Sequence, residues 1–245
     1  MKYLNLQIPT CWQELTQEQL RYLLYLLSAG YNEDQIRTYV LFRFANVDTI
    51  EEHPGMYLVP LENSEYHLTP QQVAEVLPML DWTVRIPLYP VRLNKVQHIS
   101  TPYNATLDAL TFENYQILEN LYQGYINTKR SDLLFSMANI LYGAVSKMDE
   151  VEKLNIYWWW GSFKAFLARR FTHLFHSSPV DNSNTEDLPM VQLRLQNMMD
   201  TQLRALTGGD ITKNATVLAM DVWSALTELD AKAEDAEESA KLTKK

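Results

Sequence analysis

His173 and His176 come closest to the spacing of a metal site, because a separation of three places both imidazoles on one face of a helix. Zinc sites use three or four ligands from histidine, cysteine and carboxylate side chains. The nearest residues offer no third ligand, since Arg169, Arg170, Thr172 and Ser177 are neither carboxylates nor thiols. We interpret both histidines as residues of a helix end, where the helix dipole favours positive charge, and predict no metal and no cofactor.

Two further features have the residue types of a chemical site without its pattern. Cys11 is the only cysteine, and a nucleophilic thiol needs a positioned histidine and a lowered pKa, which its neighbours do not supply. Gly208 and Gly209 are the only glycine pair, but the lysine of a phosphate-binding loop is missing from the required position. We predict a structural cysteine and a glycine helix C-cap, and no catalytic residue at either place.

The composition excludes several classes of protein. The chain has 245 residues, a net charge of −9, one cysteine and seven glycines. One cysteine cannot form an intrachain disulfide, and an acidic chain is poorly suited to general nucleic-acid binding. The N-terminus lacks the apolar stretch of a signal peptide, and the apolar run over residues 156–166 is too short to cross a bilayer. We therefore expect a cytoplasmic protein with no membrane partner.

The residue patterns predict an α+β fold that is predominantly α-helical. Residues 16–27 and 32–44 begin with capping residues and continue with an apolar face, as helices do. Residues 56–68 have the pattern of a β-hairpin, and the prolines between residues 81 and 103 favour short edge strands and loops. The buried side of the second helix is predicted to hold Ile36, Tyr39, Val40 and either Phe42 or Phe44. A strand is predicted over residues 4–8. Further helices are predicted over residues 69–77, 131–142, 152–175 and 190–206, and two more begin near residues 111 and 214.

Composition also divides the chain into regions. The small β element is expected within residues 50–105, and the Ser, Asn, Asp and Pro residues of 177–189 are typical of a linker. The tail after Asp230 is dominated by Ala, Glu and Lys, which indicates either a solvated helix or disorder. The predicted regions are an N-terminal α+β region (1–105), a helical body (106–176), the linker (177–189) and a C-terminal helical region with an acidic tail (190–245).

The most unusual string is Tyr-Trp-Trp-Trp at residues 157–160. Consecutive side chains lie roughly 100° apart around a helix, so either the helix is central or one tryptophan is exposed as a contact residue. Three basic residues follow among aromatic residues, with no acid between 161 and 176. Such a face suits single-stranded nucleic acid, but a solvated helix face is the interpretation we favour. The candidate partner-binding residues are Trp158, Trp159, Phe163, Lys164, Arg169, Arg170 and Trp223.

The two ends of the chain resemble a known family. Residues 8–20 contain Pro9-Thr10-Cys11-Trp12 followed by Glu-Leu-Thr, which resembles the start of small accessory proteins from tailed-phage and prophage structural gene clusters. Residues 160–175 and 203–226 are similar to the helical end of phage tail assembly chaperones. The resemblance covers about the first 45 and the last 90 residues, and residues 50–105 have no counterpart in it.

The resemblance implies a mostly helical, non-enzymatic protein that binds the apolar tape-measure protein, or another tail protein, in the host cytoplasm. Such chaperones keep the client soluble while the tail tube polymerises, and leave before the virion is complete. One alternative is a structural connector or internal virion protein that stays in the particle. A second is a nucleic-acid-binding regulator that uses the face from Lys164 to Arg170. A third is an enzyme in which His53, His67 or His98 meets distant carboxylates.

Overall fold

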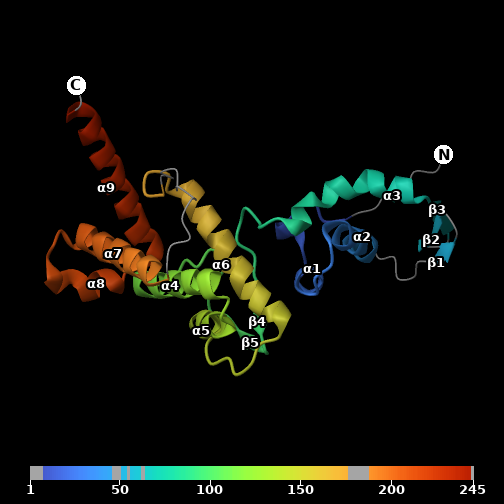
Figure 1. Cartoon of the computed structure of the whole chain (residues 1–245), viewed down its shortest axis with the longest axis horizontal. Helices are drawn as coiled ribbons and strands as arrows, with labels where there is room; N and C mark the ends of the chain where they lie inside the picture. The colour runs from blue at the N-terminus through green and yellow to red at the C-terminus, as the bar shows by residue number, and fades with distance from the viewer. Residues whose placement is uncertain (1–7, 46–50, 54–55, 62–63, 176–187, 244–245) are drawn as a thin grey trace.

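The computed structural model describes residues 8–45, 51–53, 56–61, 64–175 and 188–243. The longest helix of the middle of the chain, α6 (Glu150–Arg170), runs between an N-terminal and a C-terminal group of elements (Figure 1). The predicted class, α+β with a predominance of helix, is confirmed. The other α-helices are α1 (Gln17–Ser28), α2 (Glu33–Phe44), α3 (Pro70–Val76), α4 (Phe112–Thr128), α5 (Ser131–Tyr142), α7 (Leu188–Thr207), α8 (Asn214–Leu218) and α9 (Val222–Thr243).

The described strands form two small antiparallel sheets. The first sheet has the order β1-β2-β3 and contains the predicted hairpin, and the second pairs β4 with β5. The strands are β1 (Glu51–His53), β2 (Met56–Leu61), β3 (Ser64–Leu68), β4 (Lys95–Val96) and β5 (Ile99–Ser100), and the short 3-10 helices are η1 (Trp12–Glu14), η2 (Leu77–Val84) and η3 (Ile211–Lys213).

Side-chain caps explain where the N-terminal helices begin. Thr16, Asn32 and Thr69 each form a capping box, in which the cap side chain accepts a hydrogen bond from the backbone N–H three residues later. Gly30 separates α1 from α2 with a φ of +77°, a conformation that other residues adopt at a cost. These local signals are complete within four residues, so the predictions of these helix starts are confirmed.

Several predicted details are wrong. Tyr39 is exposed, and Leu41 takes a buried place on α2 instead. The sequence predicts Ser131 as the cap of the helix that ends at Tyr142, but Ser131 is the first residue of α5 and the cap position belongs to Arg130. Helix α6 begins at Glu150 after the cap residue Asp149, and it ends at Arg170. The predicted helix from residue 214 is two helices, α8 and α9, and α9 continues as a helix through most of the acidic tail.

Two predictions fall largely outside the described residues. These are the strand over residues 4–8 and the linker over residues 177–189. At the end of that range, residues 188 and 189 already belong to α7. The strand β1 and the 3-10 helix η2 were absent from the predictions, because neither has a clear two-fold or 3.6-fold pattern of apolar residues.

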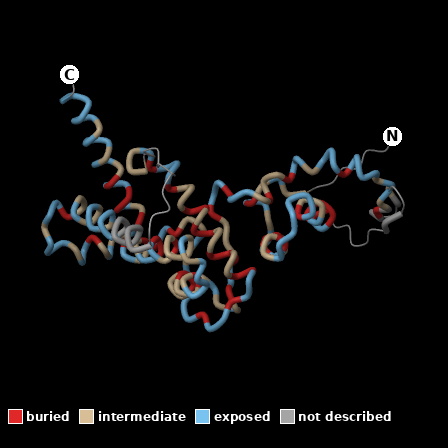
Figure 2. Tube along the Cα trace, in the orientation of Figure 1, coloured by how far each residue is buried: buried red, intermediate tan, exposed pale blue. Residues whose placement is uncertain are grey.

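Helix α6 contributes to two separate clusters of buried apolar residues (Figure 2). The N-terminal cluster runs from Trp12 to Leu93 and includes Val151 at the start of α6. The C-terminal cluster runs from Val96 to Leu229 and includes the middle and end of α6. The change from one cluster to the other therefore falls just before β4. The helix is shared between both clusters, which requires apolar residues on several of its faces.

The three tryptophans of α6 follow from this shared position. Trp158 is half-buried and packs on the N-terminal cluster, where its ring centroid lies 5.1 Å from that of Trp12. Trp159 and Trp160 have no exposed surface and belong to the C-terminal cluster. Of the two readings of the tryptophan string, the central helix is therefore the one that the structure supports.

A buried polar junction joins the loop before β4 to α5 and α6. The Leu93 N–H donates to Asn155 Oδ1 at 2.7 Å, and the Tyr142 hydroxyl donates to the Leu93 carbonyl at 2.5 Å. Asn155 Nδ2 donates to the Tyr142 oxygen at 3.1 Å. Burial raises the pKa of Tyr142, so its hydroxyl stays protonated and able to donate. The loop that leaves the N-terminal cluster is thus held on the helices of the C-terminal one.

Candidate functional site

A hollow of about 590 Å³ lies between the C-terminal end of α6, the start of α9 and two loops that precede α4. We call it the α6–α9 groove. Its lining comes from segments that are far apart in the sequence, and it combines aromatic with basic side chains. The lining residues are Tyr89, Thr106, Asp108, Phe166, Arg169, Arg170 and Trp223.

The aromatic residues of the groove form a continuous surface. Phe166 lies between the other two rings, with centroid distances of 5.4 Å to Tyr89 and 5.8 Å to Trp223. The indole N–H of Trp223 donates to the Thr106 carbonyl at 3.2 Å, which fixes the orientation of the ring. Phe171 packs beside Trp223 at 5.8 Å. An apolar side chain of a partner would therefore meet a surface that is already ordered.

The two cations of the groove have no counter-charge among the residues that the structure describes. Arg169 lies over the Tyr89 ring, 5.2 Å from its centroid, and its Nε donates to the Ala165 carbonyl. Arg170 completes the last turn of α6, where the helix dipole favours positive charge. Among the described residues, neither arginine forms an ion pair.

The one acidic residue in the lining is already engaged. The Asp108 carboxylate accepts hydrogen bonds from Asn104 Nδ2 at 2.6 Å and from the Thr106 hydroxyl at 2.7 Å. Its own N–H donates to Asn104 Oδ1 at 3.0 Å, which closes a compact loop. The groove therefore offers two guanidinium groups to a carboxylate that another molecule would bring.

The structure brings together three of the seven candidate residues, namely Arg169, Arg170 and Trp223. Trp159 and Phe163 have no exposed surface, so we remove them from the candidate surface and assign them to the core. Trp158 packs against the N-terminal cluster, away from the groove residues. The burial of these residues follows from the shared position of α6, which sequence spacing alone does not reveal.

Lys164 is also removed from the candidate surface, because it forms an internal ion pair with the buried carboxylate of Glu119. The other oxygen of this carboxylate accepts a hydrogen bond from the Trp160 indole at 3.1 Å. Gln123 Nε2 donates to the carboxylate as well, at 2.8 Å. The Lys164 ammonium lies 5.3 Å from the centroid of the Tyr122 ring. This network links α4 to α6 and uses the lysine for the fold.

Two groove residues, Tyr89 and Phe166, were absent from the candidate set. Phe166 lies in the basic aromatic segment of α6, but spacing does not tell which of its aromatic residues reaches the surface. Tyr89 stands between Pro87 and Pro90 in a segment that exposes Ile86, Leu88 and Tyr89. Apolar residues held in a proline-rich loop are the signal that points to an exposed contact surface here.

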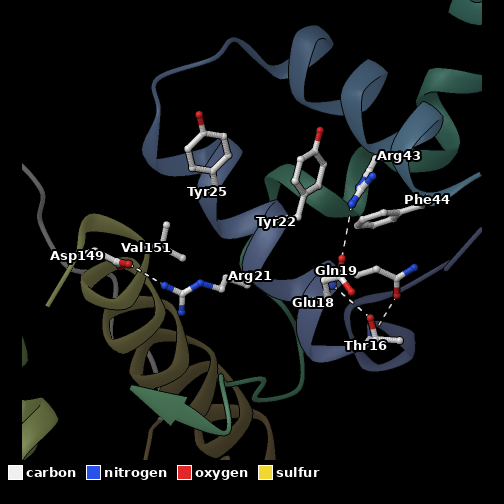
Figure 3. A pocket seen from close by; sticks show the side chains of 10 residues that line it. All are labelled: Thr16, Glu18, Gln19, Arg21, Tyr22, Tyr25, Arg43, Phe44, Asp149 and Val151. Atoms are coloured by element: carbon white, nitrogen blue, oxygen red, sulfur yellow. Dashed lines mark hydrogen bonds and ion pairs between the residues drawn. The ribbon is translucent and has the colours of Figure 1, made fainter. Parts of the chain in front are cut away.

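A second hollow, of about 630 Å³, lies where α1 and α2 meet the start of α6 (Figure 3). Its charged side chains are partnered within the chain. Arg21 forms an ion pair with Asp149 at 2.7 Å, and Arg43 with Glu18 at 3.5 Å. Figure 3 shows the Arg21–Asp149 contact bridging α1 and α6. Because these charges are already satisfied, we interpret this hollow as the seam between the two groups of elements.

His173 and the glycine pair, both first considered for chemistry, lie just beyond the ends of α6 and α7. His173 Nδ1 lies 3.3 Å from Glu237 Oε2, and His176 is outside the described residues. The described part of the chain contains no group of three His, Cys, Asp or Glu residues arranged to hold a metal ion. Gly208 and Gly209 have φ values of +63° and +84° at the end of α7, which confirms the predicted C-cap.

The histidines of the enzyme alternative are spread over both sheets. His53 and His67 belong to β1 and β3 of the first sheet, and His98 stands in the turn of the second, with a φ of +82°. No helix in the described residues is long and apolar enough to cross a membrane. Comparison of the chain with family models, curated proteins and solved structures finds no match.

Proposed function

We propose that this protein is a non-enzymatic assembly factor, a phage or prophage tail assembly chaperone that binds the tape-measure protein or another tail protein. The α6–α9 groove carries the proposal. Four of its lining residues come from the two C-terminal segments that resemble such chaperones: Phe166, Arg169 and Arg170 from residues 160–175, and Trp223 from residues 203–226. The resemblance and the groove thus coincide in one part of the molecule.

The chemistry of the groove defines the client segment that it fits. The ring surface of Tyr89, Phe166 and Trp223 suits apolar side chains, since aromatic residues provide large contact areas with few rotatable bonds. Arg169 and Arg170 suit a carboxylate, which a guanidinium binds through two parallel hydrogen bonds. An amphipathic helix with an acidic residue beside its apolar face has both properties.

The surface charge supports the same function. A net charge of −9 opposes non-specific aggregation, which keeps the chain soluble while it holds an apolar client. The basic groove is then a local exception that attracts an acidic segment. A binder of this kind needs no catalytic group.

Reversing the charge of the groove is expected to abolish client binding. We suggest coexpressing the chain with the tape-measure protein of the same gene cluster and measuring the soluble client. Arg169→Glu with Arg170→Glu should lower it by about tenfold or more, because carboxylates then oppose the client's acidic residues. The matched control, Arg130→Glu with Lys213→Glu, makes the same change in net charge at two exposed residues outside the groove lining. A client that is equally soluble without this chain, or with the groove variant, would contradict the proposal.

Single-stranded nucleic acid is a second candidate, because an arginine stacked on a tyrosine beside further rings is a common arrangement in its binding sites. The structure weakens this candidate, since Lys164 is paired with Glu119 and only two of the three basic residues reach the groove. Binding to a labelled single-stranded oligonucleotide that declines steeply with salt would favour this second function over the first.

A further inference from the structure

The distal part of α9 is an exposed helix without a packing partner in the described structure. Its buried residues, Val222, Ala225, Leu226 and Leu229, all lie in the first eight positions. Figure 1 shows the C-terminal end of the helix projecting away from the rest of the molecule. The isolated end of a helix is marginally stable in water, so a surface that binds it would stabilise it.

One face of this helix is used within the molecule. Asp230 Oδ1 accepts a hydrogen bond from the Leu174 N–H at 2.7 Å. One turn further along, Glu234 and Glu237 face His173, at 3.7 Å and 3.3 Å from its ring nitrogens. These contacts hold the base of α9 against the segment that follows α6.

A neighbouring face of the helix is free and has a distinct character. Asp235, Glu238 and Leu242 follow one another with spacings of three and four, so they share one face. All three are exposed, and Leu242 keeps 74% of its surface accessible to solvent. In the described part of the chain, no cation is paired with Asp235 or Glu238. The face thus presents two carboxylates and one apolar side chain, over roughly 10 Å of helix.

The groove of the same molecule cannot accept this face. Trp223, in the wall of the groove, is the second residue of α9, and Asp235 lies twelve residues later in the same helix. That separation corresponds to roughly 18 Å along a rigid axis. The contact between Asp230 and Leu174 fixes the direction of the helix, so the free face leads away from its own groove.

We propose that the α6–α9 groove of one molecule binds the Asp235–Glu238–Leu242 face of α9 from a second copy of this chain. The two carboxylates match Arg169 and Arg170, which lack counter-charges among the described residues, and Leu242 matches the ring surface. This inference uses the groove of the proposed function but does not depend on the identity of the client.

The geometry of this contact has two consequences. The groove and the α9 face are different surfaces, so a bound pair still has one unoccupied groove and one unoccupied face. Association therefore proceeds head to tail into rings or open chains. The contact is also small and relies on charge, so it is weak and sensitive to salt. Because client and second copy compete for one groove, self-association lowers the amount of chaperone available to the client.

Sedimentation velocity of the full chain over a range of concentrations tests this inference without a client. The wild-type mass average should rise with concentration at low salt and fall towards the monomer at high salt. Arg169→Glu with Arg170→Glu, and separately Asp235→Lys with Glu238→Lys, should each weaken association by about tenfold or more. The matched control is Glu75→Lys with Asp200→Lys, which changes the net charge by as much as Asp235→Lys with Glu238→Lys. Its two sites are exposed and lie outside the groove lining and the α9 face, so association should be unchanged.

Mixing the two double variants gives a sharper result. In the mixture the unchanged groove of one variant meets the unchanged acidic face of the other, and the Glu-substituted groove meets the Lys-substituted face. Both contacts pair opposite charges, so the mixture should associate although each variant alone associates weakly. Combining all four substitutions in one chain should restore association, because the charges are exchanged. A wild-type chain that remains monomeric at every concentration, or association that neither double variant alters, would overturn the inference.

The two proposals fail in different ways. If client solubility requires Arg169 and Arg170 while self-association does not, the second-copy inference is wrong and the proposed function stands. If self-association follows the expected pattern while the client needs neither arginine, the proposed function is wrong and this inference stands. The Asp235→Lys, Glu238→Lys variant should bind client at least as well as the wild type, because the competing face is lost.

Discussion

Trp159→Ala is expected to lower the free energy of unfolding by about 3–5 kcal/mol, because it removes a large side chain from a closed part of the core. Trp159 has no exposed surface. Its indole N–H donates to the Ala105 carbonyl at 2.8 Å, and its ring meets Tyr142 edge-on at 5.8 Å. Alanine at position 159 leaves a cavity and leaves the Ala105 carbonyl without its hydrogen-bond donor. Both effects destabilise the fold further, beyond the loss of buried apolar surface.

The matched substitution is Tyr89→Ala, which removes an aromatic ring from the exposed groove. Tyr89 keeps 54% of its surface accessible, so this change should cost less than about 1 kcal/mol. Urea denaturation followed by circular dichroism measures both variants on one scale. If both variants lose the same free energy of unfolding, the assignment of Trp159 to the core and of Tyr89 to a binding surface is contradicted.

Glu119→Ala is expected to cost about 3 kcal/mol, because it removes the common acceptor of a buried network. Trp160, Gln123 and Lys164 all direct donors at this carboxylate. With alanine the buried indole N–H of Trp160 loses its partner, and Lys164 loses its counter-charge. The figure is lower than for a fully buried pair, since Lys164 is partly exposed and water replaces part of the lost interaction.

Glu119→Gln is the informative control for this network. Its amide oxygen still accepts from Trp160, while the charge that pairs with Lys164 is gone. The loss should therefore be smaller than for alanine, by about 1 kcal/mol or more. If both variants unfold at the denaturant concentration of the wild type, the network contributes little and Lys164 returns to the candidate surface.

The sequence predicts features that are decided within a few residues. The capping boxes at Thr16, Asn32 and Thr69, and the C-cap at Gly208, are local, and the structure contains each of them. The hairpin of β2 and β3 was also predictable, since its alternation and turn residues are contiguous. Tyr39 shows the limit of prediction from local patterns. Its spacing on α2 predicts a buried side chain, but among the described residues no neighbouring element covers it, and it is exposed.

The candidate site was only partly predictable, because it depends on contacts between distant segments. Lys164 is neutralised by Glu119, which stands 45 residues earlier in the chain. Trp159 and Phe163 are buried since α6 is covered on several faces by elements whose positions no local pattern contains. The groove itself joins Tyr89 to Phe166 and Trp223, and only the fold brings these three together.

Site-specific photocrosslinking tests the central claim, that the α6–α9 groove is the surface that binds a protein client. A photoreactive phenylalanine analogue is placed at position 89, in the groove, or at position 25, beside the charge-paired hollow of the seam. Both native tyrosines are about half exposed, so the two probes have similar access to solvent. We predict that irradiation of cells coexpressing the tape-measure protein joins the client to position 89 and not to position 25. Crosslinks from position 25 alone, or in equal yield from both positions, would contradict the claim.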